Sequence, residues 1–174
     1  ALFGAPGQPF RAAFPRPVAE LVHLAVRSAK VNPWPAQALL SLGATVPPVS
    51  WAVCSTIGFV GKRAHRDTFQ ADVRSTTGAN KWAYFRTMYE LMLHDASDLL
   101  PSIRCPVLVV AGTHDWVTPV SAAEKMAQAT PGAELLVFEG TSHFGVIEHG
   151  PRLWEPIDRL LERYRVPYVN VTEE

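Results

Sequence analysis

The 174-residue chain is long enough to bury the core of one domain, and its composition, 48% hydrophobic and 18% charged, is that of a globular protein. Its 16 basic and 16 acidic residues cancel to a net charge of zero, so the charge balance does not favour nucleic acid or an anionic membrane surface as a partner. The two cysteines form no metal-binding pattern or disulfide framework. We expect a reducing, cytoplasmic compartment, with Cys105 as a small buried residue at a strand entrance.

The chain opens on residues 1–5, which are predicted to be the end of a sheet strand. Residues 4–7, Gly-Ala-Pro-Gly, are predicted to form the turn that closes this strand. A strand end is an unusual start for a whole protein, so we expect a sheet with further strands before residue 1.

Residues 8–98 differ from the rest of the chain, because prolines are frequent and the segments between them have helical spacing without strand-like alternation. We therefore predict an all-helical region. Its expected helices cover residues 18–29, 35–42, 50–60 and 67–75, the third being strongly apolar and equally compatible with the lining of a pocket.

The clearest helix of this region starts from Asn80, a residue type favoured at the N-cap position. Helical spacing then places Trp82, Phe85, Tyr89 and Met92 on one face. We expect this aromatic face to lie over an active site, which makes Trp82, Phe85 and Tyr89 candidate substrate contacts. Packing between helices is the alternative role for each of them.

Two short apolar runs, residues 107–111 and 135–138, predict strands in the last third of the chain. Their Val- and Leu-rich composition without strict alternation favours strands buried on both faces, as in a parallel sheet. The residues between them have helical spacing, begin with Pro119 and stop at Pro131 and Gly132, which predicts a βαβ unit. Residues 151–164 form a final amphipathic helix packed on the sheet, and residues 166–174 a tail.

Asp115 and His143 follow the two predicted strands directly, in loops at the carboxyl ends where open α/β sheets carry their chemistry. A carboxylate that holds one ring nitrogen of a histidine lets the other nitrogen take a proton from a hydroxyl nucleophile. The alternatives are an Asp115 that caps the next helix and a His143 that is an ordinary loop residue. We expect Thr118 to be the cap, because the helix is predicted to begin near Pro119.

Trp116 and Phe144 each come directly after one of these two residues. Both are candidates for the wall of a substrate pocket, and Trp116 could also shield the carboxylate from water. Ordinary packing is the alternative for both.

Two spaced patterns follow the predicted strands: Gly112-x-x-Asp115-x-x-x-Pro119 and Gly140-x-x-His143-x-x-x-x-Glu148-x-x-Pro151. Together they resemble the C-terminal half of an α/β-hydrolase, a family whose triad runs in the order nucleophile, acid, histidine. The resemblance implies Asp115 as the triad acid and His143 as the general base.

The resemblance also implies the fold: a partial α/β-hydrolase fold with C-terminal parallel strands, flanking helices and an inserted helical cap. Residues 1–7 would be the end of a core strand, residues 8–98 the cap, and residues 99–174 the C-terminal part of the core. No cofactor is implied.

The nucleophile is missing, because the chain contains no Gly-x-Ser-x-Gly elbow. We expect it in an N-terminal half of the core, which is a separate chain, a cleaved chain or a segment outside this sequence. With Ser as the nucleophile, the protein would hydrolyse an ester, lactone or related acyl bond of a small, partly hydrophobic substrate.

Two alternatives remain open. With Asp at the elbow, the resemblance implies an epoxide hydrolase or haloalkane dehalogenase, in which Tyr84, Tyr89 or Trp82 would grip the leaving atom. Without a nucleophile in either half, the chain would belong to a non-catalytic binding module, since a fold does not determine a function.

Overall fold

The computed structural model describes residues 2–3 and 16–164 of the chain. The turn predicted at residues 4–7 and the tail predicted at residues 166–174 lie outside these ranges. Within the described ranges, none of the helices combines the length and the apolar character that crossing a membrane would require.

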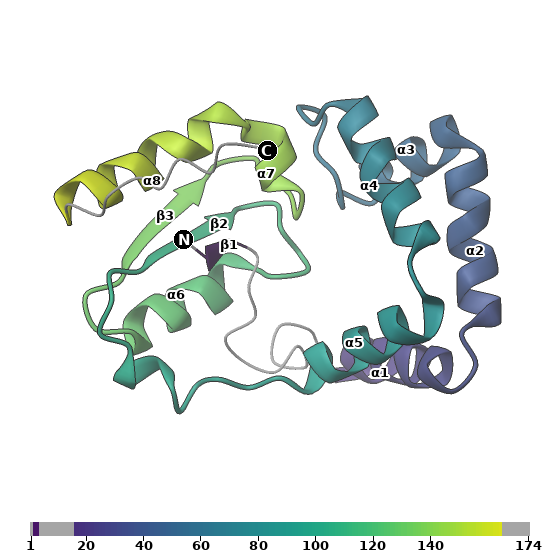
Figure 1. Cartoon of the computed structure of the whole chain (residues 1–174), viewed down its shortest axis with the longest axis horizontal. Helices are drawn as coiled ribbons and strands as arrows, with labels where there is room; N and C mark the ends of the chain where they lie inside the picture. Colours follow the sequence, from purple (N-terminus) through teal and green to yellow (C-terminus); the bar gives the residue numbers. More distant parts are fainter. Residues whose placement is uncertain (1, 4–15, 165–174) are drawn as a thin grey trace, which may run out of the picture.

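A parallel sheet forms one side of the molecule (Figure 1). Its order is β1 (Leu2–Phe3), β2 (Leu108–Gly112) and β3 (Glu134–Phe138), with Val109 in register with both Leu2 and Leu135. Helix α6 (Val120–Ala129) connects β2 to β3. The predicted βαβ unit is therefore confirmed.

The core lies on both faces of β2, whose five residues are all buried. On one face Val109 and Ala111 pack against Met126 of α6, and on the other Leu108 packs against Leu153 of α8 (Pro151–Arg163). Figure 1 shows these two helices on opposite faces of the sheet. The final amphipathic helix is thus confirmed, and the buried apolar faces hold β2 at the centre of the three strands.

The prediction of full burial is wrong for β3. Its residues alternate between half-buried and exposed, and Leu135 and Val137 are 38% and 39% exposed. In the described part of the chain β3 pairs only with β2, and α6 covers the neighbouring β2 residues on that face. Apolar composition alone does not distinguish such an edge strand from a central one.

Residues 16–93 form five helices without any strand among them, which we call the helical segment (Figure 1). Helix α1 packs on α5, and α2 packs on α4. The five are α1 (Arg16–Val31), α2 (Trp34–Thr45), α3 (Pro47–Thr56), α4 (Arg66–Gly78) and α5 (Lys81–Leu93). The described ranges also contain a short 3₁₀ turn, Leu100–Ser102, and a short helix, α7 (Gly145–His149).

Short-range sequence signals predict the start of α5 correctly, but not the end of α2 or the exposure of Leu21. Asn80 caps α5 as predicted, since its side-chain oxygen accepts from the Ala83 N–H at 3.0 Å. Helix α2, however, runs through Gly43, where we expected it to end. Helical spacing in residues 18–29 also predicts one apolar stripe with Leu21, Val22, Ala25 and Ala29. Ala29 is buried, but Leu21 is 68% exposed, because the buried residues of α1 are the small Ala19 and Ala29.

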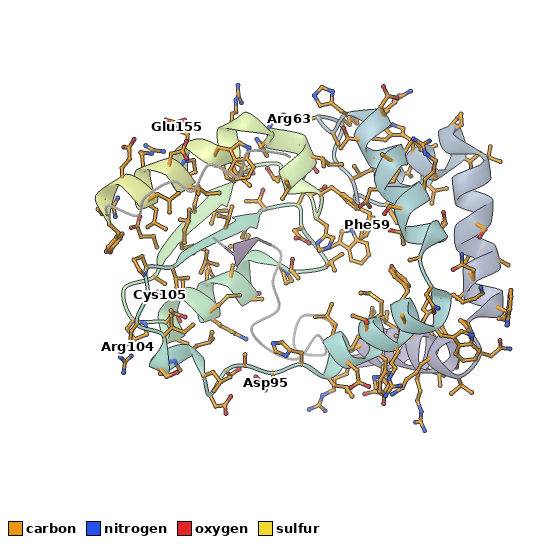
Figure 2. The ribbon with its side chains drawn as sticks, in the orientation of Figure 1. Phe59, Arg63, Asp95, Arg104, Cys105 and Glu155 are labelled. Atoms are coloured by element: carbon orange, nitrogen blue, oxygen red, sulfur yellow. The ribbon has the colours of Figure 1, made fainter. Side chains whose placement is uncertain are left out.

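Both cysteines are free. Cys105 is exposed, so the prediction of a buried residue there is wrong; it lies ahead of the first buried residue of the strand region, Val107, at the outer edge of the molecule in Figure 2. Cys54 is half-buried in α3, and burial raises the pKa of its thiol. A reducing, cytoplasmic compartment remains a prediction of the sequence.

Candidate active site

The loops that follow β2 and β3 are bonded to each other beyond the ends of the strands. The Thr113 N–H donates to the Phe138 carbonyl at 3.1 Å, and the His114 N–H donates to the Thr141 carbonyl at 2.9 Å. The Gly140 N–H donates to the Thr113 hydroxyl oxygen at 2.8 Å. These bonds hold the loop of Asp115 against the loop of His143, and none of them involves the side chain of Asp115 or of His143.

Gly112, the last residue of β2, lets the two loops approach this closely. A Cβ at this position would lie 2.8 Å from the Thr141 carbonyl carbon and closer still to its oxygen, and neither atom can move without breaking the bond to His114. The glycine of the first sequence pattern is therefore required by a backbone contact between the two loops.

We expect Gly112→Ala to lower the free energy of unfolding of the complete protein by about 1–3 kcal/mol, the usual cost of forcing an extra methyl into packed atoms. Gly78→Ala at the end of α4 is the matched control, since a Cβ there meets nothing within 4 Å. It should change stability by no more than about 0.5 kcal/mol. Urea unfolding measures both, and equal effects would contradict the proposed close approach.

Asp115 and His143 face each other across the two loops. The imidazole Nδ1 lies 3.2 Å from Asp115 Oδ1 and 3.1 Å from Oδ2. The aspartate side chain is 1% exposed and the histidine side chain 28%. When Nδ1 carries the proton that it donates to the carboxylate, Nε2 is left as the basic nitrogen.

Three further donors converge on the Asp115 carboxylate. The Val117 and Thr118 N–H groups donate to Oδ1 at 2.9 and 2.8 Å, and the Thr118 hydroxyl donates to Oδ2 at 2.6 Å. Burial acts to raise the pKa of Asp115, but the hydrogen bonds from His143 and Thr118 outweigh it and hold the pKa below its ordinary value of 3.8. The group is therefore a carboxylate at neutral pH.

The helix cap predicted at Thr118 is wrong. Helix α6 begins at Val120, its N-cap residue is Pro119, and that cap makes no side-chain hydrogen bond. The Thr118 hydroxyl is instead bonded to Asp115. Asp115 caps the turn that precedes the helix, so its structural role and its contact with His143 coexist.

An aromatic cluster lies beside His143, composed of Phe59, Phe69, Trp116 and Phe144. The Phe59 ring stacks on the imidazole, with 5.4 Å between the ring centroids and 27° between the planes. The Phe59 ring also contacts Trp116 at 5.9 Å and Phe144 at 5.2 Å, and Phe69 meets Phe144 at 5.5 Å.

The sequence indicated two members of this cluster, Trp116 and Phe144, through their positions next to Asp115 and His143. It missed Phe59, which lies in the turn after α3 and reaches toward the strand-end loops in Figure 2. The sequence signal that could have indicated Phe59 was the apolar stretch of residues 50–60, which was interpreted as either a helix or the lining of a pocket.

The three α5 residues predicted as substrate contacts lie elsewhere. Phe85 is buried in the helical segment, and the Tyr89 ring packs against His23 at 5.6 Å and under the Lys30 ammonium at 3.8 Å, both on α1. Trp82 is half exposed. Among the contacts of the described residues, none brings these side chains to His143, and their role toward a substrate remains a prediction.

Ser142 and His149, both next to pattern residues, have partners of their own. Ser142 is buried, and its hydroxyl makes a short hydrogen bond to Glu148. His149 Nε2 lies 2.5 Å from the Thr141 hydroxyl oxygen, the ring stacks on Phe138, and burial lowers the pKa of His149. Across residues 2–3 and 16–164, no group of three or more His, Cys, Asp or Glu side chains could hold a metal ion.

Comparison with known families agrees with this fold. A family model described as the alpha/beta hydrolase fold matches residues 15–150. The chain therefore belongs to the α/β-hydrolase fold family, as a partial α/β-hydrolase fold with a short parallel sheet and many helices.

Three particular relatives illustrate the likeness. A thermophilic esterase from Thermogutta terrifontis is 18% identical with a TM-score of 0.64, over 93% of this chain and 54% of its own. The esterase EaEST from Exiguobacterium antarcticum is 20% identical with a TM-score of 0.62, over 83% of this chain and 48% of its own. The polyketide synthase ThaQ of Burkholderia thailandensis is 32% identical over 87 residues, which are 50% of this chain and 4% of that protein. The chain thus spans about half the length of the similar solved structures and a small part of the curated relative.

Proposed function

We propose that this chain supplies the acid, the general base and the cap of a serine hydrolase that cleaves an ester, lactone or related acyl bond. The observation that carries the proposal is the Asp115–His143 pair, in which a buried carboxylate lies within 3.2 Å of the imidazole Nδ1. The family to which the chain belongs and its likeness to esterase structures support the same reaction class.

In this mechanism His143 Nε2 takes the proton of the nucleophile's hydroxyl as that oxygen attacks the acyl carbon. The imidazolium is stabilised by Asp115, which is ionised and held in place by three donors from its own turn. His143 then gives the proton to the leaving group and takes another from the water that releases the acyl group.

The nucleophile belongs, in this proposal, to an N-terminal half of the core. Ser142 is the serine next to the base, but it is buried and its hydroxyl is bonded to Glu148. A span of about half of each similar structure leaves room in the whole protein for further strands and an elbow. Such a half would also supply a neighbour for β1, which pairs only with β2 within the described ranges.

We assign the helical segment the role of the cap, and Trp116 and Phe144 the role of a pocket wall. Trp116 is 45% exposed beside Phe59, so apolar surface is open to a ligand near the base. Aromatic surface at this place favours a small, partly hydrophobic substrate, which gains from being removed from water.

Covalent labelling with a fluorophosphonate tests the proposal. The complete protein should be labelled at one serine outside residues 1–174, and His143→Ala should slow the labelling strongly because the base that activates the hydroxyl is gone. Hydrolytic turnover without any labelling would contradict a serine nucleophile and would indicate an aspartate nucleophile instead. Absence of both turnover and labelling would leave a binding module.

A further inference from the structure

Glu148 joins two segments that are far apart in the sequence, the turn after α3 (residues 57–65) and the loop of the base. Its Oε1 accepts the Gly61 N–H at 2.9 Å. The Ser142 hydroxyl donates a short hydrogen bond to the same oxygen, and the Ser142 N–H donates to Oε2 at 3.3 Å. Three donors thus converge on one carboxylate.

Glu148 is a buried residue, 9% exposed, and a buried carboxylate is stable only when donors replace its water. The site is shaped around it: a Cβ on Gly61 would lie 2.5 Å from Glu148 Oε2 and 2.7 Å from Cδ. Gly61 therefore lets the turn approach the carboxylate, and the turn and the base loop are held at one distance.

Phe59 belongs to the turn that Glu148 holds. Its carbonyl oxygen lies 3.2 Å from the Ser142 hydroxyl, and its ring stacks on His143. Only Val60 separates Phe59 from Gly61, whose N–H is bonded to Glu148, so the position of the phenyl ring depends on the position of the carboxylate.

The bond to Asp115 leaves the plane of the imidazole incompletely defined. His143 Nδ1 is almost equally distant from the two carboxylate oxygens, at 3.1 and 3.2 Å, so the ring can turn and exchange one oxygen for the other. Rotation about the bond between Cβ and the ring has only a broad preference. A second contact on the ring face is needed to direct Nε2 along one line.

We propose that Phe59, held by Glu148 through the turn at residues 57–65, is the positioning residue that sets the ring plane of His143. The inference rests on the proposed function, in which His143 is the general base. It couples the helical segment to the base: when the turn is in place, the imidazole faces the nucleophile, and when the turn is released, the imidazole rotates.

The expected effect is on turnover, because the Phe59 ring lies against the face of the imidazole and Glu148 contacts the turn and the base loop. Both residues therefore act on the direction of Nε2. Apolar packing of Val60 and Ala64 against Ile147 also holds the turn, so loss of the Glu148 charge should loosen the turn without unfolding it. This makes the positioning role separable from a role in stability.

A double-mutant cycle with Phe59→Leu and Glu148→Gln in the complete protein tests the coupling, using p-nitrophenyl acetate as substrate. Each variant should lower kcat about 10-fold with KM changed less than about 2-fold, as expected from a misplaced base. The double variant should lower kcat little beyond either single one, because Glu148 acts through the Phe59 ring. Multiplied losses, or unchanged kcat in either single variant, would overturn the inference.

Two control variants separate positioning from charge and from stability. Glu155→Gln removes the same charge from an exposed position on α8 (Figure 2) and should leave kcat unchanged. Leu160→Ala weakens the packing of α8 on the sheet, in a buried cluster separate from that of the turn, and a loss of kcat there equal to that of Phe59→Leu would overturn the inference. If Glu148→Gln fails to fold, Gly61→Ala displaces the carboxylate from the opposite side and takes its place in the cycle.

The same assay distinguishes the two levels of proposal. Turnover retained in His143→Ala would contradict the proposed function itself. Turnover lost in His143→Ala but unchanged in Phe59→Leu would contradict the positioning role alone.

Discussion

His143→Ala is expected to reduce kcat of the complete protein by at least about 10⁴-fold, the scale seen when a triad histidine is removed. The reason is the position of the ring: Nδ1 is held by the buried Asp115 carboxylate, which leaves Nε2 as the basic nitrogen that the reaction needs. Steady-state kinetics on an activated ester measure the loss.

The same substitution should leave folding almost intact. The imidazole is 28% exposed, and Asp115 keeps the donors from Val117 and Thr118 when His143 is gone. Because His143→Ala loses the stacking on Phe59, we expect it to lower the free energy of unfolding, but by no more than about 1.5 kcal/mol.

His114→Ala is the matched control for that experiment. His114 lies in the same loop, and its side chain is exposed, so its removal should not affect turnover. Near-wild-type turnover in His143→Ala would remove His143 from the mechanism, and equal losses in the two variants would show that the loop and not the base was disturbed.

Asp115→Asn should lower kcat by about 10⁴-fold, because an amide can donate to Nδ1 and then favours the tautomer with the proton on Nε2. That tautomer has no basic nitrogen directed at the nucleophile. KM should change far less than kcat, since Asp115 is buried behind the imidazole. Asp98→Asn, at an exposed position in the connector before β2, is the kinetic control.

The pH dependence of stability gives an independent measurement of the same carboxylate. The pKa of Asp115 in the folded protein is lower than its ordinary value of 3.8, so its charge stabilises the folded state above that pH. Below about pH 4 the stabilisation is lost progressively as the pH falls through the folded pKa. The difference in unfolding free energy between wild type and Asp115→Asn should therefore narrow in that range, and a constant difference down to pH 2 would contradict the lowered pKa.

The sequence pattern was sufficient to predict the βαβ unit and the Asn80 helix cap, because both are stabilised by interactions between residues close in the chain. An apolar run, a glycine loop and an amphipathic helix identify a βαβ unit, and chain order alone then brings Asp115 and His143 to neighbouring strand ends. The Asn80 cap was predictable for the same reason, since a side chain that caps a helix bonds its own next turn.

Contacts between distant segments were not predictable in this way. Phe59 reaches His143 because Glu148 holds Gly61 from a helix far along the chain, and no spacing in the sequence encodes that meeting. The exposure of Cys105 was not predictable for the same reason, because it depends on which other segments pack against this residue and not on the residue type.

By itself, the sequence determined the class of fold and the acid and histidine at the strand ends, because both follow from interactions between residues close in the chain. Only the tertiary structure decided that β3 is half-exposed, that Tyr89 of α5 packs on α1 and that a phenyl ring from the helical segment stacks on His143. Burial and ring stacking are properties of assembled surfaces, and they exist only after the segments have met.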